Sequence, residues 1–216
     1  MSKVILCKLT DQNLRTYGGF QWELNVPPPR LSGVGGLCSS NFYHCYEHPL
    51  LAVLLNPTHA KIENPRGFYI AAEGKAKNYK GLKRGYPLMV LKEEFTLPEI
   101  TFNQRIAFGI LCALEVCDDV AFRNWAEKWL SGEDRAAETA QAAWAKALTT
   151  RTVVRAAWTA WSTLAAARAT WAATQVEWTA RADVREAAKA AAQAAEISAN
   201  KPLDLIAPAE KAITYN

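Results

Sequence analysis

The sequence predicts an α+β fold, with a small mixed β-sheet and one short helix over residues 1–97 and an all-α module over residues 98–216. Two features predict it. Eight of the ten prolines and nine of the eleven glycines lie in the first 100 residues, whereas 25 of the 60 residues from 136 to 195 are alanine. Glycine and proline interrupt regular structure, and alanine is the strongest helix former. The first part should therefore turn often, and the second should form long helices.

Five short segments of the first part predict β-strands, because they are rich in β-branched and aromatic residues or alternate apolar and polar side chains. They are residues 4–9, 17–24, 42–45, 68–72 and 88–91. Prolines and glycines between residues 27 and 36 predict a loop. Residues 50–55 predict a short helix, since Pro49 suits a first helical turn and Pro57 ends the helix. Strands around one short helix are typical of an α+β unit.

Two amphipathic helices are predicted at the start of the second part. The first covers residues 102–117, because large apolar residues recur at every fourth position. These residues are Phe102, Ile106, Ile110 and Leu114. The second begins at Asp118 or Asp119, either of which can cap it, and ends at Gly132, which can adopt a left-handed conformation. Its buried face is expected to comprise Phe122, Trp125 and Trp129.

The alanine-rich tract from residue 136 to 195 carries tryptophans near a heptad spacing, which predicts close helix packing or self-association. The tryptophans are Trp144, Trp158, Trp161, Trp171 and Trp178. The tract is predicted to form either a folded-back bundle or one long helix of about 90 Å. A bend near residues 149–154 would favour the bundle, because β-branched side chains weaken a helix there. A single long helix would expose the indoles and would require self-association.

Composition and charge exclude several classes of protein. The net charge of +4 excludes a polyanionic DNA mimic, and it does not demand a nucleic-acid partner. Because 50% of the residues are apolar, wholesale disorder is excluded. No apolar run approaches 18 residues, and the N-terminus lacks the layout of a signal peptide. Five cysteines without a CxxC pair indicate reduced thiols. We therefore expect a cytoplasmic protein that is not a membrane protein.

One basic cluster is a candidate contact site for a partner. It lies at the end of a predicted hairpin and consists of Lys75, Lys77, Tyr79, Lys80, Lys83 and Arg84. Lysine and arginine side chains could meet phosphates or an acidic protein surface, and tyrosine could stack on bases. The alternative is a solvated hairpin whose lysines discourage pairing with other strands.

The cysteine and histidine residues of the first part give no strong signal for chemistry. They are Cys38, His44, Cys45, His48 and His59. Their spacing matches no standard zinc motif, and the adjacent His44 and Cys45 would point to opposite faces of a strand. A nucleophilic cysteine–histidine pair would lack an orienting third group. We therefore assign no catalytic, cofactor-binding or metal-ligating residue and expect no cofactor.

The segments 18–23 (GGFQWE) and 42–50 (FYHCYEHPL) resemble a family of phage- and prophage-encoded domains with a Gly-Phe-His-Ala-Cys-Glu-x-Pro-Leu-type motif. The similarity covers roughly residues 1–97. Members of the family also continue into segments like residues 104–108 (QRIAF) and 129–135 (WLSGEDR), followed by an Ala-rich tail. The family has no characterised activity, so the resemblance implies an origin in a phage and no chemistry.

We expect a phage accessory protein that acts by protein–protein interaction with a host protein or with itself, because the alanine- and tryptophan-rich module would provide self-association or a docking surface. Inhibition of a host defence system is the role expected as an extension of the resemblance. A homo-oligomer would form through the helical module. One alternative is an ADP-ribosyltransferase-like enzyme using NAD, because the strand-then-helix pattern of residues 42–52 is similar to that fold. Such an enzyme would use Tyr17, His44, Tyr69 and Glu94. The other alternative is nucleic-acid binding through residues 75–84.

Overall fold

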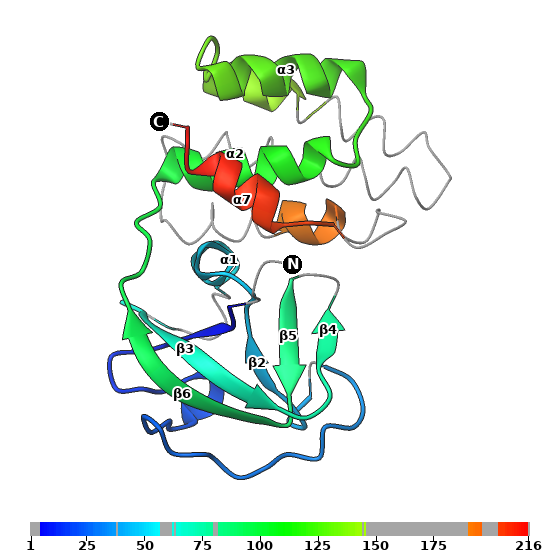
Figure 1. Cartoon of the computed structure of the whole chain (residues 1–216). Coiled ribbons are helices and arrows are strands. Elements are labelled where there is room, and N and C mark those ends of the chain that lie inside the picture. Colours follow the sequence, from blue (N-terminus) through cyan, green and yellow to red (C-terminus); the bar gives the residue numbers. More distant parts are fainter. Residues whose placement is uncertain are drawn as a thin grey trace. The chain divides into compact units, whose positions relative to one another are not determined.

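The computed structural model describes residues 5–37, 39–56, 62, 64–79, 82–143, 145, 190–195 and 203–215 (Figure 1). The chain divides into two compact units, Met1–Glu99 and Ile100–Asn216, called unit 1 and unit 2 below. The described part of unit 1 contains the strands and one short α-helix, and the described part of unit 2 is helical. The protein is therefore an α+β protein.

In the described part of unit 1, six strands form two three-stranded sheets. They are β1 (Cys7–Thr10), β2 (Tyr43–Cys45), β3 (Arg66–Glu73), β4 (Lys77–Tyr79), β5 (Lys83–Tyr86) and β6 (Leu88–Phe95). One sheet has the order β1-β3-β6 and the other the order β2-β5-β4, and every pairing is antiparallel. The sequence predicts one mixed sheet instead, because strand propensity does not specify which strands pair. The predicted pairing of residues 68–72 with residues 88–91 is confirmed as β3–β6, whereas the basic stretch between them forms a further pair of strands, β4 and β5, that the sequence does not predict.

A backbone bridge between Cys7 of β1 and Tyr46, which follows β2, joins the two sheets. The Cys7 amide donates to the Tyr46 carbonyl at 2.9 Å, and the Tyr46 amide donates to the Cys7 carbonyl at 2.8 Å. This bridge places β1 beside β2, so a side chain on β1 can meet residues of both sheets. Successive side chains of β1 point to opposite faces, which separates Cys7 and Leu9 from Lys8.

The predicted strand over residues 17–24 is wrong. Residues 17–19 form the short 3-10 helix η1 (Tyr17–Gly19), and Gly18 and Gly19 have φ angles of 73° and 75°. This left-handed conformation suits glycine and breaks a strand. The chain then returns so that Trp22, only 2% exposed, packs with Tyr43, Phe68, Met89 and other core residues. Its indole N–H donates to Thr16 Oγ1 at 3.0 Å.

The predicted short helix is confirmed as α1 (Pro49–Leu54). His48 caps it, since its Nδ1 accepts from the Leu50 amide at 3.2 Å. Cys7 and Leu9 of β1 share a second core cluster with Ala52 of this helix. The two faces of β1 therefore contact different layers, with α1 on one face and the Trp22 core on the other.

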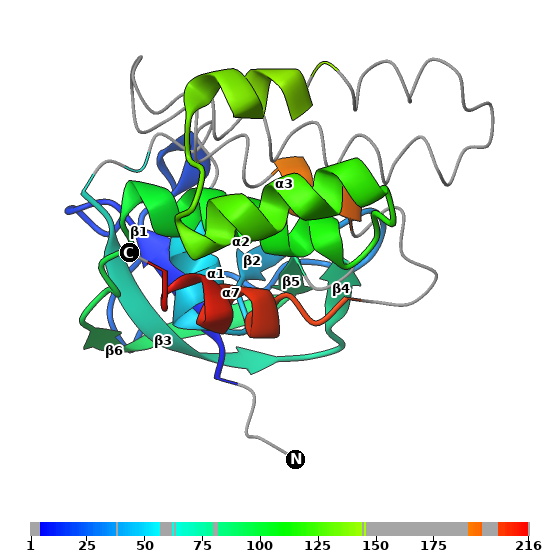
Figure 2. The same ribbon diagram turned by 90° about the horizontal axis from the view of Figure 1, so that it is seen from above.

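Unit 2 begins with a helix that is buried along most of its length, α2 (Phe102–Leu114). Thr101 and Gln104 form a reciprocal capping box at its first turn. Every residue from 106 to 113 is buried, so α2 is covered all round rather than on the one face that its spacing predicts. Figure 2 shows α3 (Val120–Ser131) and α7 (Ile206–Ala212) running beside it.

The boundaries of α3 are those that its sequence predicts. Asp119 accepts from the Phe122 amide at 2.7 Å, and Gly132 ends the helix with a φ of 81°. The predicted buried face is confirmed, since Phe122, Trp125 and Trp129 are all buried.

The last helix, α7, returns to the first helix of the unit. It packs against α2, and Gln104 Nε2 donates to the Ile213 carbonyl at 2.9 Å. Residues 137–143 and 190–195 are also helical. The five tryptophans predicted for helix packing, Trp144, Trp158, Trp161, Trp171 and Trp178, lie outside the described residues.

We predict that Gly85→Ala destabilises unit 1 by about 1–3 kcal/mol, as overpacking of a core does. A Cβ at residue 85 would collide with the side chain of Leu37 and would lie 3.0 Å from Phe42 Cβ. Urea unfolding measures the effect. Gly36→Ala is the control, because nothing lies within 4 Å of the Cβ added there. Equal stability of the two variants would contradict this packing on β5.

We predict that Asp119→Ala destabilises α3 by about 1 kcal/mol, because it removes the N-cap. Asp118→Ala is the matched control, since the Asp118 side chain is 97% exposed and only pairs with Arg123 on the surface. Hydrogen exchange of the α3 amides should accelerate in the first variant and stay nearly unchanged in the second. The reverse order would contradict the assignment of Asp119 as the cap.

Candidate basic hairpin of unit 1

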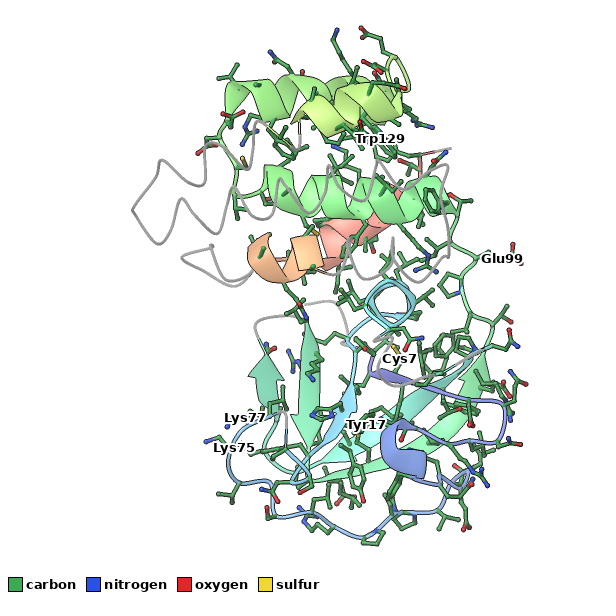
Figure 3. All side chains as sticks on the ribbon, turned by 180° about the vertical axis from the view of Figure 1, so that it is seen from behind. Cys7, Tyr17, Lys75, Lys77, Glu99 and Trp129 are labelled. Carbon is green, nitrogen blue, oxygen red and sulfur yellow. The ribbon has the colours of Figure 1, made fainter. Side chains whose placement is uncertain are left out.

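The candidate partner site is the hairpin of β4 and β5, with Lys75 just before it. Lys77 lies opposite Gly85, and Asn78 lies opposite Arg84. The order β2-β5-β4 makes β4 the edge strand of its sheet. Figure 3 shows Lys75 and Lys77 beside β4 at the margin of unit 1. Lys80 and the side chain of Tyr79 lie outside the described residues.

The basic residues of the hairpin divide into an outer and an inner pair. The outer pair, Lys75 and Lys77, is exposed, and neither forms a salt bridge with a described carboxylate. Lys77 Nζ donates to the Gly35 carbonyl, and it lies 5.8 Å from the centroid of the Phe42 ring. The Lys77 ammonium group is therefore hydrogen-bonded to unit 1, although the residue is exposed.

The inner pair is bound into unit 1. Arg84 pairs with Glu47 at 2.5 Å, and the Glu47 side chain is only 15% exposed. Lys83 is half-buried, and its charge contributes to lowering the pKa of both Lys8 and His44. Arg84 therefore holds the hairpin to the start of α1, whereas Lys75 and Lys77 are the residues that a partner could reach.

Lys8 is a buried cation that the sequence analysis missed. Burial lowers its pKa to about 8, an effect to which Lys83 adds. Its Nζ donates to the His44 carbonyl at 2.7 Å and lies 4.9 Å from the Trp22 ring centroid. A lysine inside the apolar run of residues 4–9 is the signal that could have revealed it. Because Lys8 Nζ already donates to the His44 carbonyl and lies close to the Trp22 ring, we assign Lys8 to the core and not to a partner site.

The cysteine and histidine residues do not form an assembled site in the described part of unit 1. Burial raises the pKa of the Cys7 and Cys45 thiols to about 12, so both stay protonated and unreactive at neutral pH. His44 Nε2 hydrogen-bonds the Leu37 carbonyl at 2.6 Å, and His48 caps α1. The described residues contain no group of three side chains that could hold a metal ion. The other two residues of the predicted set, Cys38 and His59, lie outside the described residues.

The residues considered for an NAD-using enzyme are dispersed. Tyr17 lies in η1 and is 69% exposed, and the Tyr69 ring packs on Phe95 at 4.7 Å. Glu94 accepts two hydrogen bonds from Arg66, at 2.8 and 2.6 Å, which lower the pKa of its carboxyl. Glu94 pairs with Phe68, the neighbour of Tyr69 on β3, so Glu94 and Tyr69 lie on opposite faces of the sheet.

Comparison with family models, with curated proteins and with solved structures finds no match for this chain. Among the described residues, no helix combines the length and the apolar character that crossing a membrane requires. What the chain binds must therefore be inferred from its own side chains, of which Lys75 and Lys77 are the most accessible charged pair of the candidate site.

We predict that acidification destabilises unit 1 through His44. Burial lowers its pKa from 6.5 to about 4. Between those values the unfolded chain binds the proton that the folded chain excludes, so stability is lost as the pH falls from 6.5 to 4. The loss should be about 1–3 kcal/mol. His44→Gln should remove it, as measured by urea unfolding at several pH values.

His48→Asn is the control for this experiment, because asparagine keeps a side-chain acceptor for the cap of α1. This variant should retain the acid sensitivity of the parent chain. An unchanged acid sensitivity in His44→Gln would contradict the role given to His44.

Proposed function

We propose that the protein is a phage accessory protein that acts by binding another protein, and that Lys75 and Lys77 contact an acidic surface of that partner. The observation that carries this proposal is an exposed lysine pair, Lys77 on the edge strand β4 and Lys75 two residues before it, which lacks a carboxylate partner among the described residues. Accessible charges steer association with a surface of opposite sign. The phage origin rests on the resemblance of residues 18–23 and 42–50.

The biological role that we propose is inhibition of a host defence system in the cytoplasm of the infected cell. The alanine- and tryptophan-rich tract would supply self-association or a second docking surface, as a bundle or as one long helix. The regular spacing of tryptophans among alanines in the sequence supports helix packing, because small residues let helices approach each other and large rings fill the gaps. Light scattering of the full chain tests the self-association.

Binding explains unit 1 better than catalysis does. The described thiols are protonated, His44 is engaged by a backbone carbonyl, and the sheet separates Tyr69 from Glu94. An ADP-ribosyltransferase-like activity with NAD therefore gains no support from these residues. Nucleic-acid binding is the second candidate, since exposed lysines suit phosphates as well as carboxylates. Binding to nucleic acid would fall steeply with salt and would disappear after nuclease treatment.

The test is affinity capture by the full chain from bacterial host cells after nuclease treatment, followed by titration of the purified partner. We predict that Lys75→Glu/Lys77→Glu raises the Kd at least about tenfold, because two attractive contacts become repulsive. Arg15→Glu/Lys92→Glu is the matched control, since it reverses two other exposed charges of unit 1. This control should change the Kd less than about threefold.

Equal weakening by the two double variants would mean that net charge acts rather than this site. A partner whose affinity neither variant alters would contradict the proposed contact at Lys75 and Lys77. If nuclease treatment abolishes the complex, the partner is nucleic acid and not a protein.

A further inference from the structure

Residues 26–30 (Val-Pro-Pro-Pro-Arg) form a segment of unit 1 that belongs to neither sheet (Figure 1). A proline ring fixes its own φ at about −65°, and a residue that precedes proline is restricted to an extended conformation. Val26, Pro27 and Pro28 each precede a proline, and the described residues contain no cis peptide bond. The segment is therefore a short polyproline II helix.

Burial along the segment follows the three-residue period of this helix. Pro28 and Leu31, which are three residues apart, are half-buried and mark the edge that lies against unit 1. The residues of the other two edges are all exposed. They are Val26 with Pro29, and Pro27 with Arg30. A partner can therefore reach two of the three edges of the helix.

The segment is held in place by hydrogen bonds to unit 1. The Asn25 amide, just before it, donates to the Leu91 carbonyl at 2.8 Å. The hydroxyl of the buried Tyr43 donates to the Pro29 carbonyl, also at 2.8 Å. A polyproline II helix has little conformational freedom to lose, and these anchors reduce it further. Such preorganisation raises the affinity for a partner.

The groups that a partner would contact are accessible at the described residues. The carbonyls of Pro27 and Pro28 accept no hydrogen bond there. Arg30 lies 3.6 Å from Glu73, but the two side chains are 56% and 69% exposed, so this ion pair is weak. A carboxylate of a partner could therefore take the place of Glu73.

We propose that residues 26–30 dock into an aromatic groove of a partner protein, and that a carboxylate beside this groove binds Arg30. The inference goes beyond the proposed function, because it adds a further surface and does not use Lys75 or Lys77. Aromatic rings pack on the two exposed edges, and donors of the groove reach the carbonyls of Pro27 and Pro28. A segment that only completed the packing of unit 1 would bind no groove.

The probe is a fluorescently labelled WW domain, a small domain whose aromatic groove binds polyproline II segments. Of several WW domains, the one that binds a capped peptide of residues 24–31 most tightly is used. It is titrated with the full chain, and fluorescence anisotropy reports binding. Saturable binding is expected, with a Kd no higher than that of the peptide, because the segment is already ordered in the protein.

Two matched pairs of variants identify the residues that the groove contacts. Pro27→Ala should raise the Kd at least about fivefold, and Pro28→Ala should change it less than about twofold, because only Pro27 lies on an exposed edge. Arg30→Glu should raise the Kd at least about tenfold, because an attractive contact becomes repulsive. Arg15→Glu reverses another exposed charge of unit 1 and should change the Kd less than about threefold.

Three results would overturn the inference. Binding of the peptide without binding of the full chain would mean that the fold hides the segment. Failure of both to bind would mean that the segment is not a ligand for such a groove. An equal effect of the two proline variants, or of the two arginine variants, would mean that the exposed edges are not recognised. Each result would leave the contact at Lys75 and Lys77 standing, since affinity capture tests it separately.

Discussion

The bridge between Cys7 and Tyr46 is the constraint on which unit 1 depends. Its two backbone hydrogen bonds, at 2.9 and 2.8 Å, join two three-stranded sheets whose named strands otherwise pair only within each sheet. Because β1 lies at this junction, one of its faces packs with α1 and the other meets the Trp22 core. The basic hairpin is also tied to the β1-β3-β6 sheet by the chain itself, since β3 leads into β4 through residues 74–76 and β5 leads into β6 through Pro87.

This junction also explains a buried lysine. The side chain of Lys8 leaves β1 on the face of Trp22, and it finds the His44 carbonyl of the other sheet at 2.7 Å. A buried ammonium group without an acceptor would be costly, so this carbonyl and the indole ring stabilise its position. The positive charge of the half-buried Lys83 adds to the cost of keeping Lys8 charged, because it lowers the pKa of Lys8. In this respect the inner cations of the hairpin differ from the outer ones. The inner cations act within unit 1, and the outer ones face solvent.

Local signals in the sequence predict the parts of the fold that local interactions determine. Asp119 and Gly132 mark the ends of α3, Pro49 marks the start of α1, and the strands over residues 68–72 and 88–91 pair with each other, as expected. The strand predicted for residues 17–24 is wrong. Apolar and polar residues alternate there as in a strand, but two glycines in the left-handed conformation reverse the chain. Strand partners, the burial of Lys8 and the division of the basic residues depend on contacts between distant segments, which periodicity does not encode. The accessibility of Lys77, by contrast, is what its place in a polar turn-rich stretch suggests.

The contact of α7 with α2 orders the steps of folding during synthesis. Unit 1 is complete once residue 99 has left the ribosome, so its sheets can assemble while the rest of the chain is still being made. The helix α2 is among the first segments of unit 2 to emerge, yet α7, which packs on it, lies at residues 206–212. The apolar surface of α2 therefore stays partly uncovered until α7 has been synthesised. A nascent chain stalled before residue 206 would present a folded unit 1 and a unit 2 with exposed apolar surface that chaperones bind.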